Sequence, residues 1–133
     1  MGQSTEGLLR AARAAQANAH APYSGFRVGA AVQGGDGQVF AGANIENASF
    51  GLTICAERAA VAAAVTSGLR TLSDVVVVSD AEPASAPCGA CRQVLHEFGP
   101  EMTVTAVSPG GTRVWKLSEL YPAPFDRGDL TAQ

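Results

Sequence analysis

An unbroken run of four valines, Val75–Val78, constrains the fold of this chain more than any other feature. A strand with one face in water alternates apolar and polar residues, so four consecutive valines indicate a strand that is buried on both faces. We therefore predict a strand over 74–79 inside a sheet. Such a strand needs helices packed on both faces of the sheet that contains it.

Three segments are predicted to be helices. Residues 4–19 and 55–67 are rich in alanine, which is the strongest helix former, and residues 88–98 form the third segment. Gly68 closes the second helix, and the pair Gly99-Pro100 ends the third. One of these helices precedes the valine run directly and another follows it, as expected for strands and helices in alternation.

Four further strands complete the prediction. Residues 26–33 and 38–45 flank a Gly-Gly-Asp-Gly turn and form a hairpin, and residues 102–107 and 113–116 flank Pro-Gly-Gly. The remainder, 117–133, is predicted to be a short turn of helix and an irregular tail. This order predicts an α/β protein of three layers, α/β/α. Its mixed sheet has about five strands and at least one crossover, and residues 1–133 form a single domain.

The composition indicates a globular protein with a small substrate. Of the 133 residues, 47% are hydrophobic and 16% are charged, and the net charge is −3 with no block of Lys or Arg. Nucleic acids are held mainly by cationic side chains, so no nucleic-acid partner is expected. No segment approaches the roughly 20 apolar residues that cross a bilayer, and residues 1–10 lack the features of an export signal. We therefore expect no membrane partner and a cytoplasmic location.

The three cysteines are an odd number, and a reducing compartment leaves metal binding or burial as their use. Cys88 and Cys91 are helical neighbours at i and i+3, and Cys55 begins another helix 33 positions upstream. If both helix starts point to one spot, three thiolates converge there, favoured by the positive helix ends. Three sulfurs leave one corner of a tetrahedral Zn²⁺ site open, which is typical of catalytic zinc.

Glu57 is the candidate proton carrier, because it lies two residues from a predicted ligand. Residues at i and i+2 of a regular helix face apart, so Cys55 and Glu57 can share a site only at an irregular first turn. An alternative is a structural zinc site completed by His96 or a carboxylate, which would make the protein a non-catalytic binding module. A structural zinc leaves Glu57 without a role.

Cys-Ala-Glu at 55–57 with Pro-Cys-Gly-Ala-Cys at 87–91 resembles the cytidine deaminase family in its three-cysteine form. The likeness extends from residue 21 to about residue 125, through Ala-Pro-Tyr-Ser at 21–24 and Asn-Ile-Glu-Asn-Ala at 44–48. The resemblance implies hydrolytic deamination of cytidine and/or 2′-deoxycytidine in pyrimidine salvage. Water activated by zinc attacks C4 of the base, while Glu57 carries a proton to N3 and later to the departing ammonia.

The resemblance also implies the remaining site residues and a homotetramer with shared active sites. Arg58 offsets the charge of the sulfurs, Asn44 and Glu46 bind the ribose, and Phe26 packs on the base. Phe125 reaches the site across a subunit contact. Phe50 stands where the family often has tyrosine, so a hydroxyl near the sugar's 5′ end is lost. The other expected substrate contacts are Ala48, through its backbone, and Ala56.

Two other enzyme classes share the metal motifs. A blasticidin-S-type nucleoside deaminase has the same ligand pattern and size, but the Asn-Ile-Glu-Asn run at 44–47 resembles cytidine deaminases more. Deamination of a base within a polynucleotide is disfavoured by the acidic balance of the chain and by the absence of basic segments with interleaved aromatic residues.

Overall fold

A computed structural model describes residues 3–131, and strand β3 (Leu72–Val78) contains the valine run. Val75 and Val77 belong to the core on one face of the sheet, and the other two valines belong to the core on the opposite face. All four are at most 5% exposed. The prediction of a strand buried on both faces is confirmed.

The sheet has five strands in the order β2-β1-β3-β4-β5. Strands β3 and β4 are parallel, and every other neighbouring pair is antiparallel, so the sheet is mixed as predicted. A helix connects the two parallel strands, as the expected crossover requires. The strands besides β3 are β1 (Gly29–Gly34), β2 (Val39–Ala43), β4 (Thr103–Ser108) and β5 (Gly111–Lys116).

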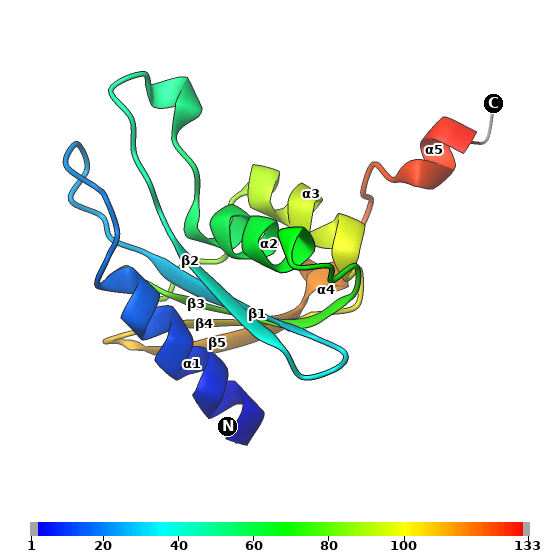
Figure 1. The fold of residues 1–133 in the computed structure, drawn as a ribbon, viewed down its shortest axis with the longest axis horizontal. Coiled ribbons are helices and arrows are strands. Elements are labelled where there is room, and N and C mark those ends of the chain that lie inside the picture. Colours follow the sequence, from blue (N-terminus) through cyan, green and yellow to red (C-terminus); the bar gives the residue numbers. More distant parts are fainter. Residues whose placement is uncertain (1–2, 132–133) are drawn as a thin grey trace.

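Helices cover both faces of the sheet (Figure 1). Helix α1 (Gln3–Gln16) packs on one face, and helices α2 (Ala56–Thr66) and α3 (Gly89–Phe98) pack on the other. The predicted three-layer α/β/α architecture is therefore confirmed. Short helices complete the described chain, namely η1 (Phe50–Leu52), α4 (Leu117–Leu120) and α5 (Arg127–Thr131), the last of which projects from the body (Figure 1).

The predicted hairpin strands were too long at the end that faces the loops. The first strand was predicted from residue 26 and starts at Gly29, and the second was predicted to residue 45 and ends at Ala43. The side chain of Asn44 is the physical reason, because its Oδ1 accepts the N–H of Val28 at 2.9 Å and its Nδ2 donates to the carbonyl of Phe26 at 2.7 Å. These side-chain bonds replace part of the backbone ladder and release the loops that precede β1 and follow β2.

The other predicted boundaries differ by smaller amounts. The first helix was predicted over 4–19 and ends at residue 16, and β5 begins two residues earlier than predicted. Helix α5 lies where an irregular tail was predicted. A five-residue helix with one leucine carries almost no apolar periodicity, so the sequence pattern could not indicate it.

Strand β2 approaches helix α2 so closely that only glycine fits at Gly42. A Cβ added there would lie 2.5 Å from the backbone nitrogen of Ala60 and 2.7 Å from the Cβ of Ala59. We expect Gly42→Ala to lower the free energy of unfolding by about 1–3 kcal/mol, because the helix must move away from the sheet. Urea denaturation measures this loss. Gly35→Ala, where an added Cβ has no atom within 4 Å, is the matched control and should leave stability nearly unchanged.

Among residues 3–131, no helix combines the length and apolar character that a membrane span requires.

Candidate active site

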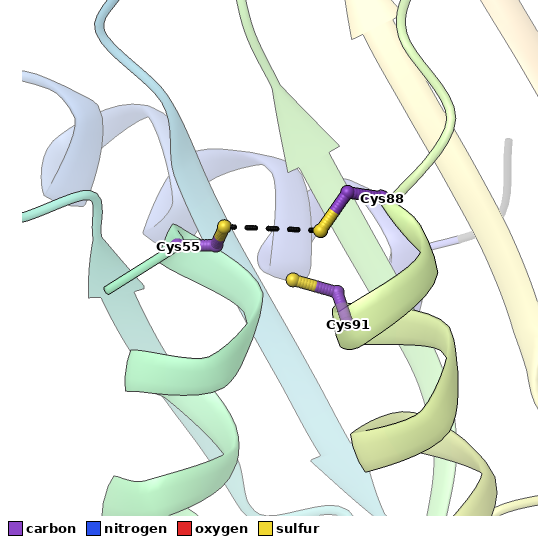
Figure 2. A group of neighbouring side chains, drawn as sticks. All are labelled: Cys55, Cys88 and Cys91. Carbon is purple, nitrogen blue, oxygen red and sulfur yellow. Dashed lines mark hydrogen bonds between the residues drawn. The ribbon is translucent and has the colours of Figure 1, made fainter. Parts of the chain in front are cut away.

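The first residues of α2 and α3 bring the three cysteines together (Figure 2). Cys55 and Cys88 are the N-cap residues of the two helices, with extended backbone angles, and neither sulfur caps its own helix. Cys91 follows within the first turn of α3 and is completely buried. Cys55 therefore lies outside the helix that contains Glu57, which removes the geometric conflict between positions i and i+2.

The spacing of the sulfurs fits zinc. The three Sγ atoms lie within 4.8 Å of one another, and those of Cys55 and Cys88 are 3.9 Å apart (Figure 2). Zn–S bonds of about 2.3 Å in a tetrahedron place two sulfurs about 3.8 Å apart. Three soft donors at this spacing hold Zn²⁺ and leave its fourth position for another ligand. The predicted convergence of the cysteines is confirmed, and the cofactor is Zn²⁺.

Neighbouring groups change the pKa values of the cysteine thiols and so affect how the cluster binds a cation. The pKa of the Cys55 thiol is lowered by a hydrogen bond from Cys91 and then by Arg58, whose Nη2 lies 3.4 Å from the Cys55 sulfur. The shared hydrogen bond and burial raise the pKa of Cys91. The Cys55 thiolate therefore forms readily, whereas that of Cys91 requires the positive charge of a metal ion.

Glu57 lies beside this cluster in the first turn of α2 and is 6% exposed. Burial raises the pKa of its carboxyl to about 7, with a further contribution from the charge of Cys55. A hydrogen bond from the backbone N–H of Glu57 to its own carboxylate opposes this increase in the pKa, but burial outweighs it. A carboxyl with these properties can both accept and release a proton near neutral pH.

Two loops beyond the ends of β1 and β2 carry the residues expected at the sugar. Asn44 is 8% exposed, and its amide joins the two loops through the bonds to Val28 and Phe26 described above. The carboxylate of Glu46 accepts the backbone N–H groups of Tyr23 at 2.9 Å and Ser24 at 3.2 Å, as well as the Ser24 hydroxyl. The hydroxyl of Ser24 is the main reason that the pKa of Glu46 is lowered.

Asn44 was predicted inside the second hairpin strand and Glu46 directly after it, but both lie past the end of β2. Ile45 between them forms isolated bridges to His20 and Ile54, which keep this stretch extended. Each polar side chain already has partners within the chain. One Asn44 amide hydrogen and part of the Glu46 carboxylate remain for a ligand.

A hollow of about 400 Å³ lies between these loops, lined by Tyr23, Ser24, Glu46, Phe50 and Thr53. Phe50 is 72% exposed, and its ring contacts that of Tyr23 edge to face, with centroids 5.6 Å apart. The cysteines and Glu57 are not among its lining residues.

The other expected contact residues lie around the two loops and on the C-terminal segment. Phe26 and Phe125 expose 41% and 55% of their surface. Ala48 is exposed on the loop before η1, and Ala56 is buried in the first turn of α2. Phe125 lies on the segment that follows α4, far along the chain from the loops.

A family model for the cytidine and deoxycytidylate deaminase zinc-binding region matches residues 3–107. The chain belongs to the cytidine deaminase family. A probable cytidine deaminase of Dictyostelium discoideum is 44% identical over 130 residues, which cover 96% of this chain and 88% of that protein. A cytidine deaminase of Halalkalibacterium halodurans is 44% identical over 125 residues, which cover 92% and 95%.

Solved structures of the family have the same fold. The crystal structure of cytidine deaminase from Burkholderia pseudomallei aligns with a TM-score of 0.87 at 44% identity and covers 94% of this chain and 100% of that one. The enzyme from Mycobacterium tuberculosis aligns with a TM-score of 0.78 at 40% identity and covers 92% and 97%. The family membership that the cysteine motifs indicated is confirmed.

Arg92 was not among the site residues predicted from the sequence of this family member. Arg92 directly follows a metal ligand, and its guanidinium donates to the carbonyl of Pro87 at 2.8 Å and to that of Leu120 at 2.7 Å. It thereby ties the residue before Cys88 to the C-terminal part of the chain. Its position next to Cys91 was the only signal in the sequence.

Substitution of Arg58 tests whether its contact with the sulfurs supports zinc binding in this deaminase-family site. Its Nε is buried without a partner among residues 3–131, and its Nη2 donates to Cys55. Groups that hydrogen-bond to metal ligands typically contribute a factor of about 10–100 to metal affinity. We expect Arg58→Ala to weaken zinc binding by about that factor in competition with a chromogenic chelator. Arg70→Ala is the control, because Arg70 lies after the C-terminal end of α2 and donates to the carbonyl of Val65, and it should leave zinc affinity unchanged.

Proposed function

We propose that this protein catalyses the zinc-dependent hydrolysis of cytidine and/or 2′-deoxycytidine to uridine or 2′-deoxyuridine and ammonia, in pyrimidine salvage. One observation carries the proposal: a buried Glu57 with a pKa raised to about 7 lies beside three sulfurs that leave a zinc position open. A structural zinc site has no use for such a carboxyl. The related proteins of Dictyostelium discoideum and Halalkalibacterium halodurans, which are named as a probable cytidine deaminase and a cytidine deaminase, agree with this substrate class.

Glu57 performs the proton transfers in this proposal. When bound, zinc supplies Lewis acidity that makes water a competent nucleophile near neutral pH. Glu57 accepts a proton from the attacking water and gives it to N3 of the base, while the oxygen bonds to C4. Glu57 then takes the remaining proton from the new C4 hydroxyl and delivers it to the amino group as the C4–N4 bond breaks, so that the oxygen becomes the C4 carbonyl and water and the nucleoside yield uridine and ammonia. Its low exposure keeps bulk water from competing for the proton.

The two loops hold the nucleoside. Asn44 and Glu46 hydrogen-bond the ribose with the amide hydrogen and carboxylate lone pairs that their internal bonds leave open. Phe26 packs on the base, and Phe50 contributes apolar surface near the 5′ end of the sugar. Ala48 and Ala56 contribute contacts beside the loop and the first turn of α2, respectively.

A homotetramer completes the sites. The two loops expose several large apolar side chains, and the hollow between them does not include Glu57. A neighbouring subunit that covers this surface and supplies its Phe125 would close the site, and exposed apolar clusters of this kind mark interfaces. The exposed side chains on the loops are Tyr23, Phe26, Ile45, Phe50, Leu52 and Ile54. We further propose that residues 1–133 form one catalytic domain that acts in the cytoplasm.

Ammonia release across a panel of substrates tests the proposal. We expect turnover of cytidine or 2′-deoxycytidine and much slower turnover of cytosine, CMP, adenosine and blasticidin S. Turnover of blasticidin S alone would assign the protein to the antibiotic deaminases. Activity confined to adenosine, or no activity by a protein that holds one zinc per chain, would refute the proposed reaction.

A further inference from the structure

The segment after α4, residues 121–126, is attached to α3 by hydrogen bonds rather than by burial. Four of its six residues are exposed, and none is buried. Leu117 and Leu120 of α4 pack against the core, so the chain is anchored up to that point. Beyond it, polar contacts with α3 determine where the segment lies, including the approach of His96 to Asp126 at 3.8 Å.

Gln93 contributes two of these contacts, and each uses a different end of its amide. Its Nε2 donates to the backbone carbonyl of Phe125 at 2.8 Å, and its Oε1 accepts the hydroxyl of Tyr121. Because donor and acceptor are both engaged, the amide has one orientation. The side chain therefore bridges both sides of the turn through Pro122 and Pro124 that presents the phenylalanine.

The same turn of α3 also carries the metal site. Cys91, Arg92 and Gln93 are consecutive, and Arg92 holds the carbonyls of Pro87 and Leu120. Position 92 thus fixes the start of the C-terminal segment, and position 93 fixes the aromatic residue within it. The location of Phe125 relative to the sulfurs follows from two neighbouring side chains.

We propose that Gln93 is a positioning residue that holds Phe125 where it can contact the nucleoside. The proposal rests on the proposed role of Phe125 at the substrate. Gln93 itself touches neither substrate nor metal. Its loss should therefore weaken substrate binding while the proton transfers at Glu57 continue.

Chymotrypsin provides a test that does not depend on activity. It cleaves after phenylalanine only when the segment leaves its place, so the cleavage rate reports how firmly the segment is held, within one subunit or within the assembly. The carbonyl that Gln93 holds is that of the bond after Phe125, whereas Pro122 protects the bond after Tyr121. We expect Gln93→Ala to accelerate release of peptide 126–133 about fivefold, followed by mass spectrometry. The matched control is Gln33→Ala, which removes a side-chain amide bonded to the Gly37 carbonyl in the hairpin and should leave this cleavage unchanged.

A double-mutant cycle tests the link to substrate binding. We expect Gln93→Ala to raise KM for cytidine about fivefold, with kcat within twofold of wild type and zinc content unchanged. In a Phe125→Ala background the same substitution should change KM by less than about 1.5-fold, because a positioning residue has no effect once its target is absent.

Each failure has a distinct meaning. Unchanged cleavage, or an equal effect of Gln93→Ala with and without Phe125, overturns the positioning role. An unaltered KM in Phe125→Ala overturns it as well, since there is then nothing at the substrate to position. If the wild-type protein deaminates no nucleoside, the proposed function falls, and the cleavage rates alone decide whether Gln93 holds the segment.

Discussion

Replacing Glu57 by glutamine is expected to lower kcat for cytidine by about a thousandfold or more while one zinc per chain is retained. Glutamine has the size and shape of glutamate but cannot accept a proton from water or return it to the base. General acid–base groups typically contribute factors of about 10²–10⁴, and here one carboxyl performs both transfers. Because Glu57 is 6% exposed, an isosteric replacement also preserves the packing of α2.

Steady-state kinetics and elemental analysis of the same preparation measure this result. The matched control is Glu101→Gln, which makes the same chemical change at an exposed glutamate and should leave kcat and zinc content unaltered. A Glu57→Gln enzyme with more than about a tenth of the wild-type kcat would remove Glu57 from the mechanism. Loss of zinc together with activity would mean that Glu57 supports the metal instead.

Replacing Cys91 by alanine should abolish both zinc retention and turnover. Cys91 is completely buried in the first turn of α3, and its loss leaves two thiols, of which that of Cys88 is exposed. Two sulfurs bind zinc far more weakly than three. Because metal binding contributes to folding free energy, the variant should also unfold at a lower temperature than the zinc-loaded wild type.

Zinc content after gel filtration, activity and thermal unfolding measure the three effects. We expect less than about a tenth of a zinc ion per chain. We also expect no turnover, and the addition of zinc should not restore it. Ala90→Ser changes the exposed neighbour of Cys91 on α3 and should retain zinc and activity. Full zinc content in Cys91→Ala would show that other residues hold the metal.

The centre of the fold and the metal site were the predictable parts. Val75–Val78 indicated a doubly buried strand because burial on both faces leaves a direct mark on the sequence. The cysteine spacing indicated one metal site because the N-termini of helices beside a sheet can converge. In both cases a local sequence pattern is compatible with one structural arrangement.

The loops were less predictable, because side chains rather than backbone patterns determine them. Asn44 ends the pairing of two strands with its amide, which no periodicity indicates. Arg92 and Gln93 read as an ordinary helix surface until the C-terminal segment lies against them. Contacts of this kind join residues about 30 positions apart, and no local sequence pattern around either residue indicates its partner.

The reactive groups and the nucleoside-holding groups come from different kinds of structure. The sulfurs and Glu57 lie at the beginnings of two helices that are packed on the sheet. In contrast, Phe26, Asn44 and Glu46 lie in connecting loops, and Phe50 lies in the short helix η1 between β2 and α2. Insertions or deletions in 20–28 and 44–54 can therefore accumulate without disturbing the chemistry. Evolution of a new nucleoside preference, or its selection in the laboratory, should proceed through those two stretches first.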